Sequence, residues 1–312
     1  MIPMKPSAIK AVNLCKYYGK TRGIEDLNLE IITGEVFGFL GPNGAGKTTT
    51  IRLILNLLRP TSGEAIVFGQ PVQKKYDRVF QNIGVVPGEL KLYEELTGSY
   101  FLKYMNQLSA RPPILRNELL EAFQLKPDQL RRRIKYYSHG MKQKLAIIQA
   151  MEHDPDLLIM DEPSEGLDPL NKNVLYHFVQ RFKEKKKTIF FSSHYLAEVE
   201  KVCHRVGLVR DGKLIAEERI EDLKHKMVRR MEIKFSKPVD TKQFDIAGIN
   251  IISQLDTELV LNVFGDLNPL ISLLARLKIE DIIFPEPSLE ETFMTFYEQT
   301  DYSAPLSGKD RL

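Results

Sequence analysis

Residues 41–48 of this 312-residue chain read Gly41-Pro42-Asn43-Gly44-Ala45-Gly46-Lys47-Thr48. They match the pattern of a phosphate-binding loop, in which a glycine, four further residues and a second glycine lead into lysine and a hydroxyl residue. An apolar run at 36–40 precedes the loop. Apolar residues after it repeat with the spacing of one helix face, at Ile51, Ile54, Leu55 and Leu58. The loop is therefore predicted to join a buried strand to a helix.

The residue types in this loop suit the chemistry of phosphate binding. Glycines let the backbone curl so that successive N–H groups point at phosphate oxygens, and the N-terminus of the following helix adds its positive dipole end. Lys47 is predicted to reach the β- and γ-phosphates, and the Thr48 hydroxyl is predicted to ligate Mg²⁺. Thr49 is placed with the loop among the nucleotide-binding residues. We therefore expect the chain to bind a nucleoside triphosphate.

Four further apolar runs accompany the strand before the loop, at 83–86, 157–160, 188–191 and 206–209. They are apolar at nearly every position, which is typical of strands buried on both faces of a parallel sheet. Helical patterns fall between them, so the predicted class is α/β, with the sheet of a P-loop nucleoside triphosphatase. Residues 97–152 carry helical patterns at 97–108, 113–124 and 139–152, and are predicted to form a helical insert in this sheet domain.

Two carboxylates follow the apolar run at 157–160, namely Asp161 and Glu162. A buried strand delivers such residues to the carboxyl edge of the sheet, where ligands bind in α/β folds. Asp161 is predicted to hold Mg²⁺, directly or through water. Glu162 is predicted to accept a proton from the attacking water or to orient that water.

The remaining segments indicate a second, smaller domain. We expect an ATP-binding domain over 1–222, a linker at 223–230, a small α+β domain over 231–300 and a mobile tail at 301–312. A turn at Gly212 leads into a strand at 213–216, and the charged stretch 217–230 is interpreted as a helix or linker. Strands are predicted near 231–235, 250–255, 258–264 and 280–284, with helices at 268–277 and 288–298. No group of residues in this second domain indicates a site.

Composition excludes several classes of protein. Lys and Arg total 44 and Asp and Glu total 41, so the net charge is only +3, and we expect no nucleic-acid partner. The basic runs at 131–133 and 185–187 are interpreted as solvated faces. Cys15 and Cys203 are too few for a disulfide framework and fit a reducing compartment. No stretch approaches the ~18 apolar residues of a membrane-spanning helix, so work at a membrane requires another subunit.

Several motifs occur in an order that resembles a known family. Residues 137–144 read YSHGMKQK, Asp161-Glu162-Pro163 and the segment SEGLD at 164–168 come next, and Ser192-Ser193-His194 end the following strand. Together with the phosphate loop, this order resembles the nucleotide-binding subunit of ABC transporters over about residues 8–222. The segment EPSLEE at 286–291 is similar to the C-terminal extension of exporter-type members.

The resemblance implies an ATP hydrolase that powers export. ATP would be the substrate and Mg²⁺ the cofactor. Two such domains would pair head to tail around the nucleotides, the second being another copy of this chain or a homologous ATPase subunit. Polytopic membrane subunits would be the transport partners, which implies a peripheral location on the cytoplasmic side of the cell membrane.

The resemblance also implies roles for residues outside the loop. Ser138 and Gly140 would cap the γ-phosphate that is bound by the other subunit. The local sequence supports this role, because Ser138 is suited to N-cap a helix at 139–152 and to expose free N–H groups to an anion. Asp168 would lie at the dimer interface beside the nucleotide.

Two further residues are assigned in the same way. His194 would contact the γ-phosphate and join Glu162 in the catalytic set. Tyr18 would stack on the adenine ring, and because Tyr17 is its neighbour the register between the two tyrosines stays open.

The chain departs from the family's pattern at two places. Gly88 stands where a glutamine usually touches Mg²⁺ and the attacking water, and whether the adjacent Glu89 serves in its place stays open. The motif at 137–144 also differs from the common one, at Tyr137, His139 and Met141. The first departure keeps open a nucleotide-responsive regulatory module as an alternative. A soluble ABC-type ATPase acting on ribosomes or DNA is the other alternative, although the chain has one cassette and no coiled-coil heptads before Asp161.

Overall fold

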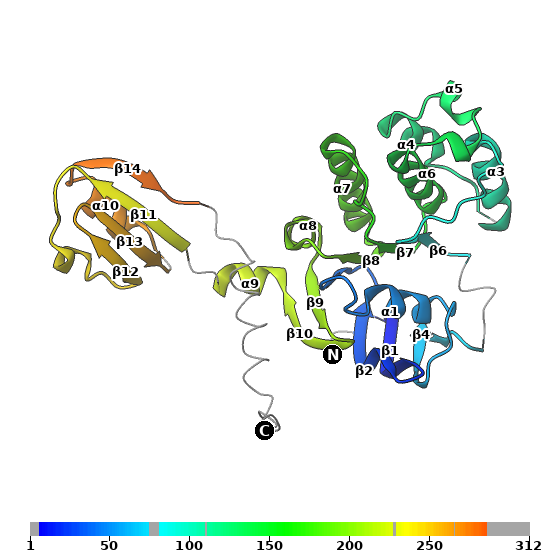
Figure 1. The fold of residues 1–312 in the computed structure, drawn as a ribbon, viewed down its shortest axis with the longest axis horizontal. Coiled ribbons are helices and arrows are strands. Elements are labelled where there is room, and N and C mark those ends of the chain that lie inside the picture. The colour runs from blue at the N-terminus through cyan, green and yellow to red at the C-terminus, as the bar shows by residue number, and fades with distance from the viewer. Residues whose placement is uncertain (1–5, 75–80, 110, 227–228, 265, 286–312) are drawn as a thin grey trace, which may run out of the picture. The chain divides into compact units, whose positions relative to one another are not determined.

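The computed structural model describes residues 6–74, 81–109, 111–226, 229–264 and 266–285. The chain divides into two compact units, Met1–Ile220 and Glu221–Leu312 (Figure 1). Each unit has its own sheet and its own apolar core. The helix expected at 288–298 and the tail expected at 301–312 lie outside the described residues.

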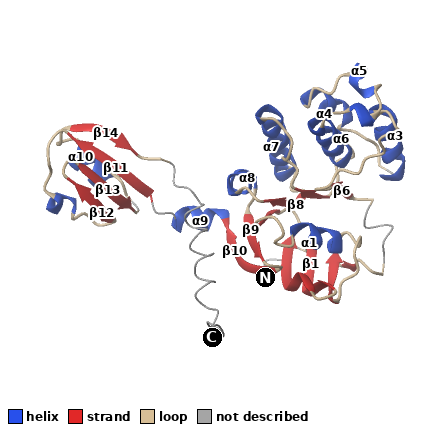
Figure 2. Cartoon of the chain, viewed as in Figure 1, coloured by secondary structure: helices blue, strands red, loops and turns tan. Residues whose placement is uncertain are grey.

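The central sheet of the first unit contains the strands that the apolar runs predict (Figure 2). Its order is β10 (Lys213–Arg219), β9 (Arg205–Arg210), β3 (Val36–Leu40), β8 (Thr188–Ser193), β7 (Leu157–Asp161) and β6 (Ile83–Val86). The strands from β9 to β6 run parallel, and β10 pairs antiparallel with β9. Because β3, β7 and β8 are buried at every position, they need apolar residues on both faces. The predicted α/β class is confirmed.

Helices cover this sheet and form the insert. The helix after the phosphate loop is α1 (Lys47–Ile54), and its predicted face is buried at Ile51 and Ile54. Figure 1 shows the helices of the insert gathered together beyond β6 and β7. They are α3 (Gly98–Ser109), α4 (Arg116–Ala122), α5 (Pro127–Leu130), the 3-10 turn at Ile134–Tyr136 and α6 (His139–Met151). The short α5 was not predicted. Two more helices, α7 (Pro169–Glu184) and α8 (Leu196–Val202), follow β7 and β8.

A second sheet in the first unit was missed by the sequence analysis. It is antiparallel and has the order β2 (Thr21–Ile32), β1 (Ser7–Tyr18), β4 (Ser62–Val67) and β5 (Gln70–Pro71). In β2 the buried residues alternate with exposed ones, at Leu27, Leu29 and Ile31. They pack in one core with residues of β3 and α1. These half-buried strands lack the continuous apolar runs on which the strand predictions relied.

The second unit is a small α+β fold. Its antiparallel sheet has the order β12 (Ile249–Leu255), β13 (Glu258–Val263), β11 (Arg229–Phe235) and β14 (Ile279–Ile283). A 3-10 turn at Thr241–Phe244 and α10 (Asn268–Leu274) supply further core residues. The charged stretch expected as helix or linker over 217–230 is divided between the end of β10, α9 (Ile220–Lys226) and the start of β11. No helix among the described residues is both long enough and apolar enough to cross a membrane.

Candidate functional site

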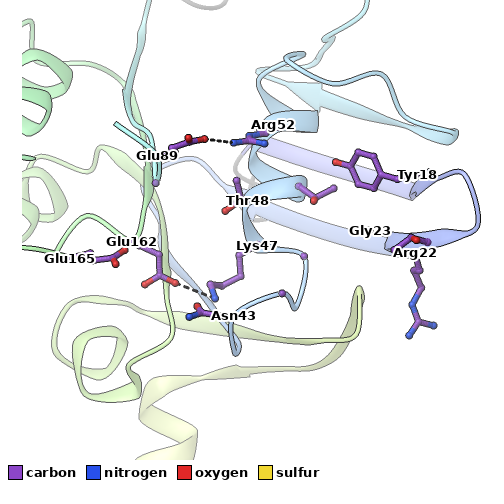
Figure 3. A pocket seen from close by; sticks show the side chains of 15 residues that line it. Tyr18, Arg22, Gly23, Asn43, Lys47, Thr48, Arg52, Glu89, Glu162 and Glu165 are labelled. Carbon is purple, nitrogen blue, oxygen red and sulfur yellow. Dashed lines mark ion pairs between the residues drawn. The ribbon is translucent and has the colours of Figure 1, made fainter. Parts of the chain in front are cut away.

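The phosphate loop connects the buried strand β3 to α1, as predicted. Gly46 caps α1 with φ of 108°, in the left-handed region that favours glycine. A Cβ at this position would lie 2.8 Å from the carbonyl oxygen of Gly23. Both the backbone conformation and the lack of space therefore favour glycine here. The loop borders a pocket of about 560 Å³ (Figure 3). The pocket is lined by loop and helix residues together with residues of four other segments, including Tyr18, Arg22, Gly88, Glu89, Glu162 and Glu165.

Lys47 points into the loop and is almost fully buried. Its Nζ donates hydrogen bonds to the carbonyl oxygens of Gly41 at 2.6 Å and Pro42 at 3.0 Å. Its Nζ also lies 3.1 Å from Oε1 of Glu162, which Figure 3 marks as an ion pair. The lysine charge is therefore held inside the loop, beside the carboxylate expected to act in catalysis.

Thr48 and Asp161 meet at the carboxyl edge of the sheet. The Thr48 hydroxyl donates a hydrogen bond to Oδ2 of Asp161 at 2.7 Å. The second carboxylate oxygen, Oδ1, accepts one from the Ser192 hydroxyl at 2.6 Å, because β7 and β8 are neighbours in the sheet. Hydroxyl and carboxylate oxygens are the hard ligands that Mg²⁺ prefers. The two residues predicted as metal ligands from distant parts of the sequence are thus in direct contact.

Glu162 holds an unusual backbone conformation, with φ of 50°. Such left-handed conformations are strained for a residue with a side chain and cluster at functional sites. Its N–H donates to the Ser192 hydroxyl at 3.1 Å, and its Oε2 lies 2.7 Å from Nδ1 of His194. Its Oε1 is buried and has no hydrogen-bond partner among the described residues, so the contact with Lys47 is electrostatic. The two residues predicted to be catalytic lie side by side although 32 positions separate them.

The structure separates the two adjacent tyrosines. Tyr18 is about half exposed and lines the pocket. The hydroxyl of Tyr17 instead donates to Oε1 of Glu25 at 2.6 Å. This hydrogen bond raises the pKa of Tyr17. Of the two candidates for a contact with the adenine ring, Tyr18 is the one at the pocket.

Ser138 and Gly140 lie away from the phosphate loop of their own chain. Ser138 caps α6, as predicted, and its hydroxyl accepts the N–H of Met141 at 3.2 Å. Gly140 packs close to the loop after β7, where a Cβ would lie 2.8 Å from the carbonyl oxygen of Gly166. Neither residue is among the described residues that line the pocket.

Asp168 has a structural role that the sequence analysis did not state. It is the N-cap of α7 and accepts hydrogen bonds from the Asn171 N–H at 2.9 Å and the Asn171 amide at 2.6 Å. These hydrogen bonds lower the pKa of Asp168. The signal was present in the sequence, because aspartate followed by Pro169 is typical of a helix start.

The two residues at the unusual glutamine position both lie at the pocket. Gly88 lies against Asp161, and a Cβ at this position would lie 2.8 Å from Oδ2 of Asp161, so that a side chain here requires the carboxylate to shift. The Glu89 carboxylate is largely exposed and lies 3.7 Å from Arg52 and 3.2 Å from Lys91 (Figure 3). Glu89 is thus engaged with cations at the rim of the pocket.

This combination of loop, strand and facing carboxylates defines a P-loop nucleoside triphosphatase. The sequence model of the family described as "ABC transporter" matches residues 24–165. The chain belongs to the ABC transporter family, as its ATP-binding and ATP-hydrolysing subunit. The family predicted from the sequence is therefore confirmed.

Relatives and solved structures agree with this assignment. The chain is 36% identical over 230 residues to the bacitracin transport ATP-binding protein BcrA of Bacillus licheniformis, over 73% of this chain and 75% of the relative. It is 38% identical over 221 residues to the daunorubicin/doxorubicin resistance ATP-binding protein DrrA of Streptomyces peucetius. This match covers 70% of this chain and 67% of the relative. A solved ATP-binding subunit of an ABC transporter is 29% identical, with a TM-score of 0.65 over 70% of this chain and 92% of that one. A solved dimeric ATP-binding cassette bound to ADP and Pi is 23% identical and shares the fold, with a TM-score of 0.62. This match covers 68% of this chain and 98% of that one.

Proposed function

We propose that this chain hydrolyses Mg²⁺-bound ATP and thereby powers export through separate polytopic membrane subunits, with the residues described above as its machinery. The observation that carries the proposal is the meeting of Lys47, Thr48, Asp161, Glu162 and His194 beside one pocket. Their charges and spacing suit phosphoryl transfer to water, which depends mainly on positioning and on stabilising negative charge.

The phosphates are bound by the loop from Gly41 to Thr49. Backbone N–H groups at the start of α1 and the Lys47 ammonium face the β- and γ-phosphates. On binding, Lys47 exchanges its contacts with backbone carbonyls and Glu162 for phosphate oxygens. Thr48 and Asp161 would hold Mg²⁺, which when bound neutralises charge on the β- and γ-phosphates.

Glu162 and His194 act on the attacking water and on the γ-phosphate. Release of Lys47 to the phosphates frees the buried Oε1 of Glu162 to accept the proton of the water. The imidazole of His194 holds the other carboxylate oxygen at 2.7 Å and fixes the direction in which Glu162 points. From the same place His194 contacts the γ-phosphate.

The site is completed by a second ATPase subunit, either another copy of this chain or a homologue. Ser138 and Gly140 carry the features of an anion site, a capped helix N-terminus with a close glycine, yet they lie outside the chain's own pocket. Asp168, at the start of α7, would approach the same interface. Head-to-tail pairing brings these residues of one subunit to the phosphate loop of the other.

The transport partner and the direction of transport follow from the family. Relatives named for bacitracin transport, for daunorubicin/doxorubicin resistance and for Nod factor export support export as the direction. We place the chain on the cytoplasmic side of the cell membrane, bound to polytopic subunits that select the cargo. The test is a mild-detergent pull-down from native membranes, which should recover a stoichiometric polytopic protein. Recovery with ribosomes or DNA would favour a soluble ATPase instead.

Replacement of Glu162 tests the hydrolytic part. Glu162→Gln keeps the shape of the side chain but removes the proton acceptor, so we expect turnover to fall by about 100-fold or more while ATP binding is retained. Glu121→Gln, at an exposed position of α4, is the matched control and should hydrolyse ATP at the wild-type rate. Near-normal turnover of Glu162→Gln would exclude this role.

The regulatory alternative rests on Gly88. A nucleotide-responsive module needs to bind ATP, but its turnover need not respond to cargo. Measuring ATP turnover of the reconstituted complex with and without a transported compound separates the two functions. Stimulation by the cargo is expected for the exporter.

A further inference from the structure

A buried carboxylate lies behind the catalytic pair, in a cluster that neither sequence pattern nor proposed mechanism uses. Glu198 of α8 is only 7% exposed. Its two oxygens accept hydrogen bonds from the Ser164 hydroxyl at 2.7 and 2.8 Å, from the Ser193 hydroxyl at 2.9 Å and from Lys172 at 3.1 Å. We call these four residues the Glu198 cluster. Because the Ser164 hydroxyl has a single hydrogen, its hydrogen bond is shared between the two oxygens, and both oxygens of the carboxylate have a partner.

The Glu198 cluster joins the two segments that carry the catalytic residues. Ser164 lies two positions after Glu162, and Ser193 immediately precedes His194. The Ser193 hydroxyl also accepts the N–H of Tyr195 at 2.9 Å, so it holds the turn on which His194 lies. The same two segments are therefore joined twice, once by the contact between Glu162 and His194 and once through Glu198.

The charge state of Glu198 suits this role. Burial opposes its ionisation, but the hydrogen bonds from Ser164, Lys172 and Ser193 outweigh burial and lower the pKa of the carboxyl. Burial and the Glu198 charge together raise the pKa of the neighbouring Tyr176 phenol, which therefore stays protonated. Glu198 is thus ionised at neutral pH and is hydrogen-bonded through both of its oxygens.

Stability alone is a poor explanation for such a network. A buried ion pair with its hydrogen bonds often contributes no more than apolar residues of the same volume would. What it does provide is directional contacts that fix the segments which bear them. The segments fixed here are the ones that carry Glu162 and His194.

We propose that Glu198 is a positioning residue for ATP hydrolysis. It holds the segment after Glu162 against the turn before His194, and so sets the distance and direction between the carboxylate and the imidazole. It also anchors the start of the segment that ends at Asp168, which we expect at the interface with the second subunit. The inference rests on the proposed hydrolytic function.

Glu198→Gln is the first test. Glutamine keeps the shape of the side chain, but its NH₂ cannot accept a hydrogen bond from Ser164, and the counter-charge of Lys172 is lost. We expect kcat to fall about tenfold, since small misplacements of catalytic groups have effects of this size or larger. The Kd for a fluorescent ATP analogue should stay within twofold of the wild type, because Glu198 is not among the described residues lining the pocket. Rates are measured per bound nucleotide, so that unfolded protein does not count.

Glu152→Gln is the matched control. Glu152 is also buried and forms a paired contact with Arg116 at 2.6 and 3.0 Å, and among the described residues its carboxylate has no hydrogen bond to either catalytic segment. Its replacement should leave kcat per bound nucleotide within twofold of the wild type. An equal fall in both variants would mean that any buried carboxylate affects turnover, and would overturn the inference.

Ser164→Ala and Ser193→Ala keep the carboxylate and provide milder variants. If the Glu198 cluster acts as one unit, the double variant should lose no more activity than Glu198→Gln, so that the separate effects are not additive. Wild-type kcat in Glu198→Gln, or strictly additive effects of the two serines, would overturn the inference. Failure of the wild-type chain itself to hydrolyse ATP would instead overturn the proposed function.

Discussion

The N-termini of α1 and α6 are both built to face an anion, but they differ in what surrounds them. At α1 the chain supplies Lys47 and brings Glu162 to within 3.1 Å of its ammonium. At α6 the capping residue Ser138 is exposed, and its hydroxyl accepts the Met141 N–H within its own helix. The first site is supplied with charge by its own chain, while the second offers a capped terminus and a close glycine. Under the proposed head-to-tail pairing, we therefore expect ATP binding to need one subunit and hydrolysis to need two.

Loss of Lys47 should have the largest effect. Lys47→Ala removes the buried ammonium that is proposed to face the phosphates and leaves Oε1 of Glu162 without its counter-charge, and loss of one partner of a buried charge pair costs about 2–5 kcal/mol. We expect the Kd for ATP to rise by about 100-fold and turnover to disappear. Isothermal titration with a non-hydrolysable ATP analogue measures the Kd. If Lys47→Ala binds ATP as tightly as the wild type, Lys47 at the N-terminus of α1 does not bind the phosphates.

Loss of Ser138 should affect turnover but not binding. Ser138→Ala removes the helix cap, worth about 1 kcal/mol of the free energy of unfolding, and weakens the contact with the partner's γ-phosphate. We expect kcat to fall about tenfold, in the lower range for loss of one donor to a transition-state anion. The Kd for ATP of the isolated subunit should not change.

Mixing the Lys47→Ala and Ser138→Ala variants sharpens the comparison. In a hybrid of Lys47→Ala with Ser138→Ala, one composite site has an intact phosphate loop from one chain and an intact Ser138 from the other. The mixture should therefore hydrolyse ATP faster than either variant alone. If the mixture only averages the two rates, the α6 terminus does not act across a dimer of this chain.

Tyr18 should have a smaller effect, limited to affinity. Tyr18→Ala removes an aromatic surface at the pocket, and aromatic stacking contributes about 0.5–1.5 kcal/mol beyond area burial. We expect the Kd for ATP to rise two- to tenfold with kcat unchanged. Tyr17→Ala is the control, since Tyr17 donates to Glu25 and is not among the described residues that line the pocket. An equal rise in both variants would contradict the assignment of the tyrosine.

The N-terminus of α7 should show the smallest effect, visible only in its dependence on pH. Hydrogen bonds from Asn171 lower the pKa of Asp168 from its ordinary value of 3.8. The folded pKa thus lies below the unfolded one, and the charge stabilises the fold above pH 3.8. This contribution is lost as the pH falls through the folded pKa. Asparagine is also a good N-cap, so Asp168→Asn removes only the charge. The Tm of Asp168→Asn should therefore lie below that of the wild type at pH 6, and the difference should shrink as the pH falls to 3.

The sequence predicted the central sheet because burial on both faces leaves a visible pattern. Runs such as 157–160 are apolar throughout, and the structure buries every residue of β7. The antiparallel sheet left no such pattern, because burial alternates along β2, β1 is only partly buried, and the pairing of the two strands shifts register between Ala11 and Leu14. The sequence also suggested a helix or linker from position 217 onward. The structure instead continues β10 through Glu217, which forms an ion pair with Arg205 at the edge of the sheet.

The sequence predicted the residues of the site that belong to local motifs, but not the residues that hold them in place. Lys47, Thr48, Asp161 and Glu162 belong to short motifs whose chemistry depends on residue type, so their roles could be inferred locally. The partners Ser192 and Glu198 could not be inferred. Their contacts depend on which strand ends and helices become neighbours after folding, and a glutamate in a helix is most often solvated.

The close approach of position 88 to Asp161 has a consequence for protein engineering. The family's usual glutamine, grafted onto Gly88 as a point change, would bring its Cβ to 2.8 Å from the carboxylate oxygen of Asp161 that accepts the Thr48 hydrogen bond. Either Asp161 or the backbone at position 88 must shift to accept it. A designer who wants to install that side chain therefore has to vary the residues around Asp161 together with position 88.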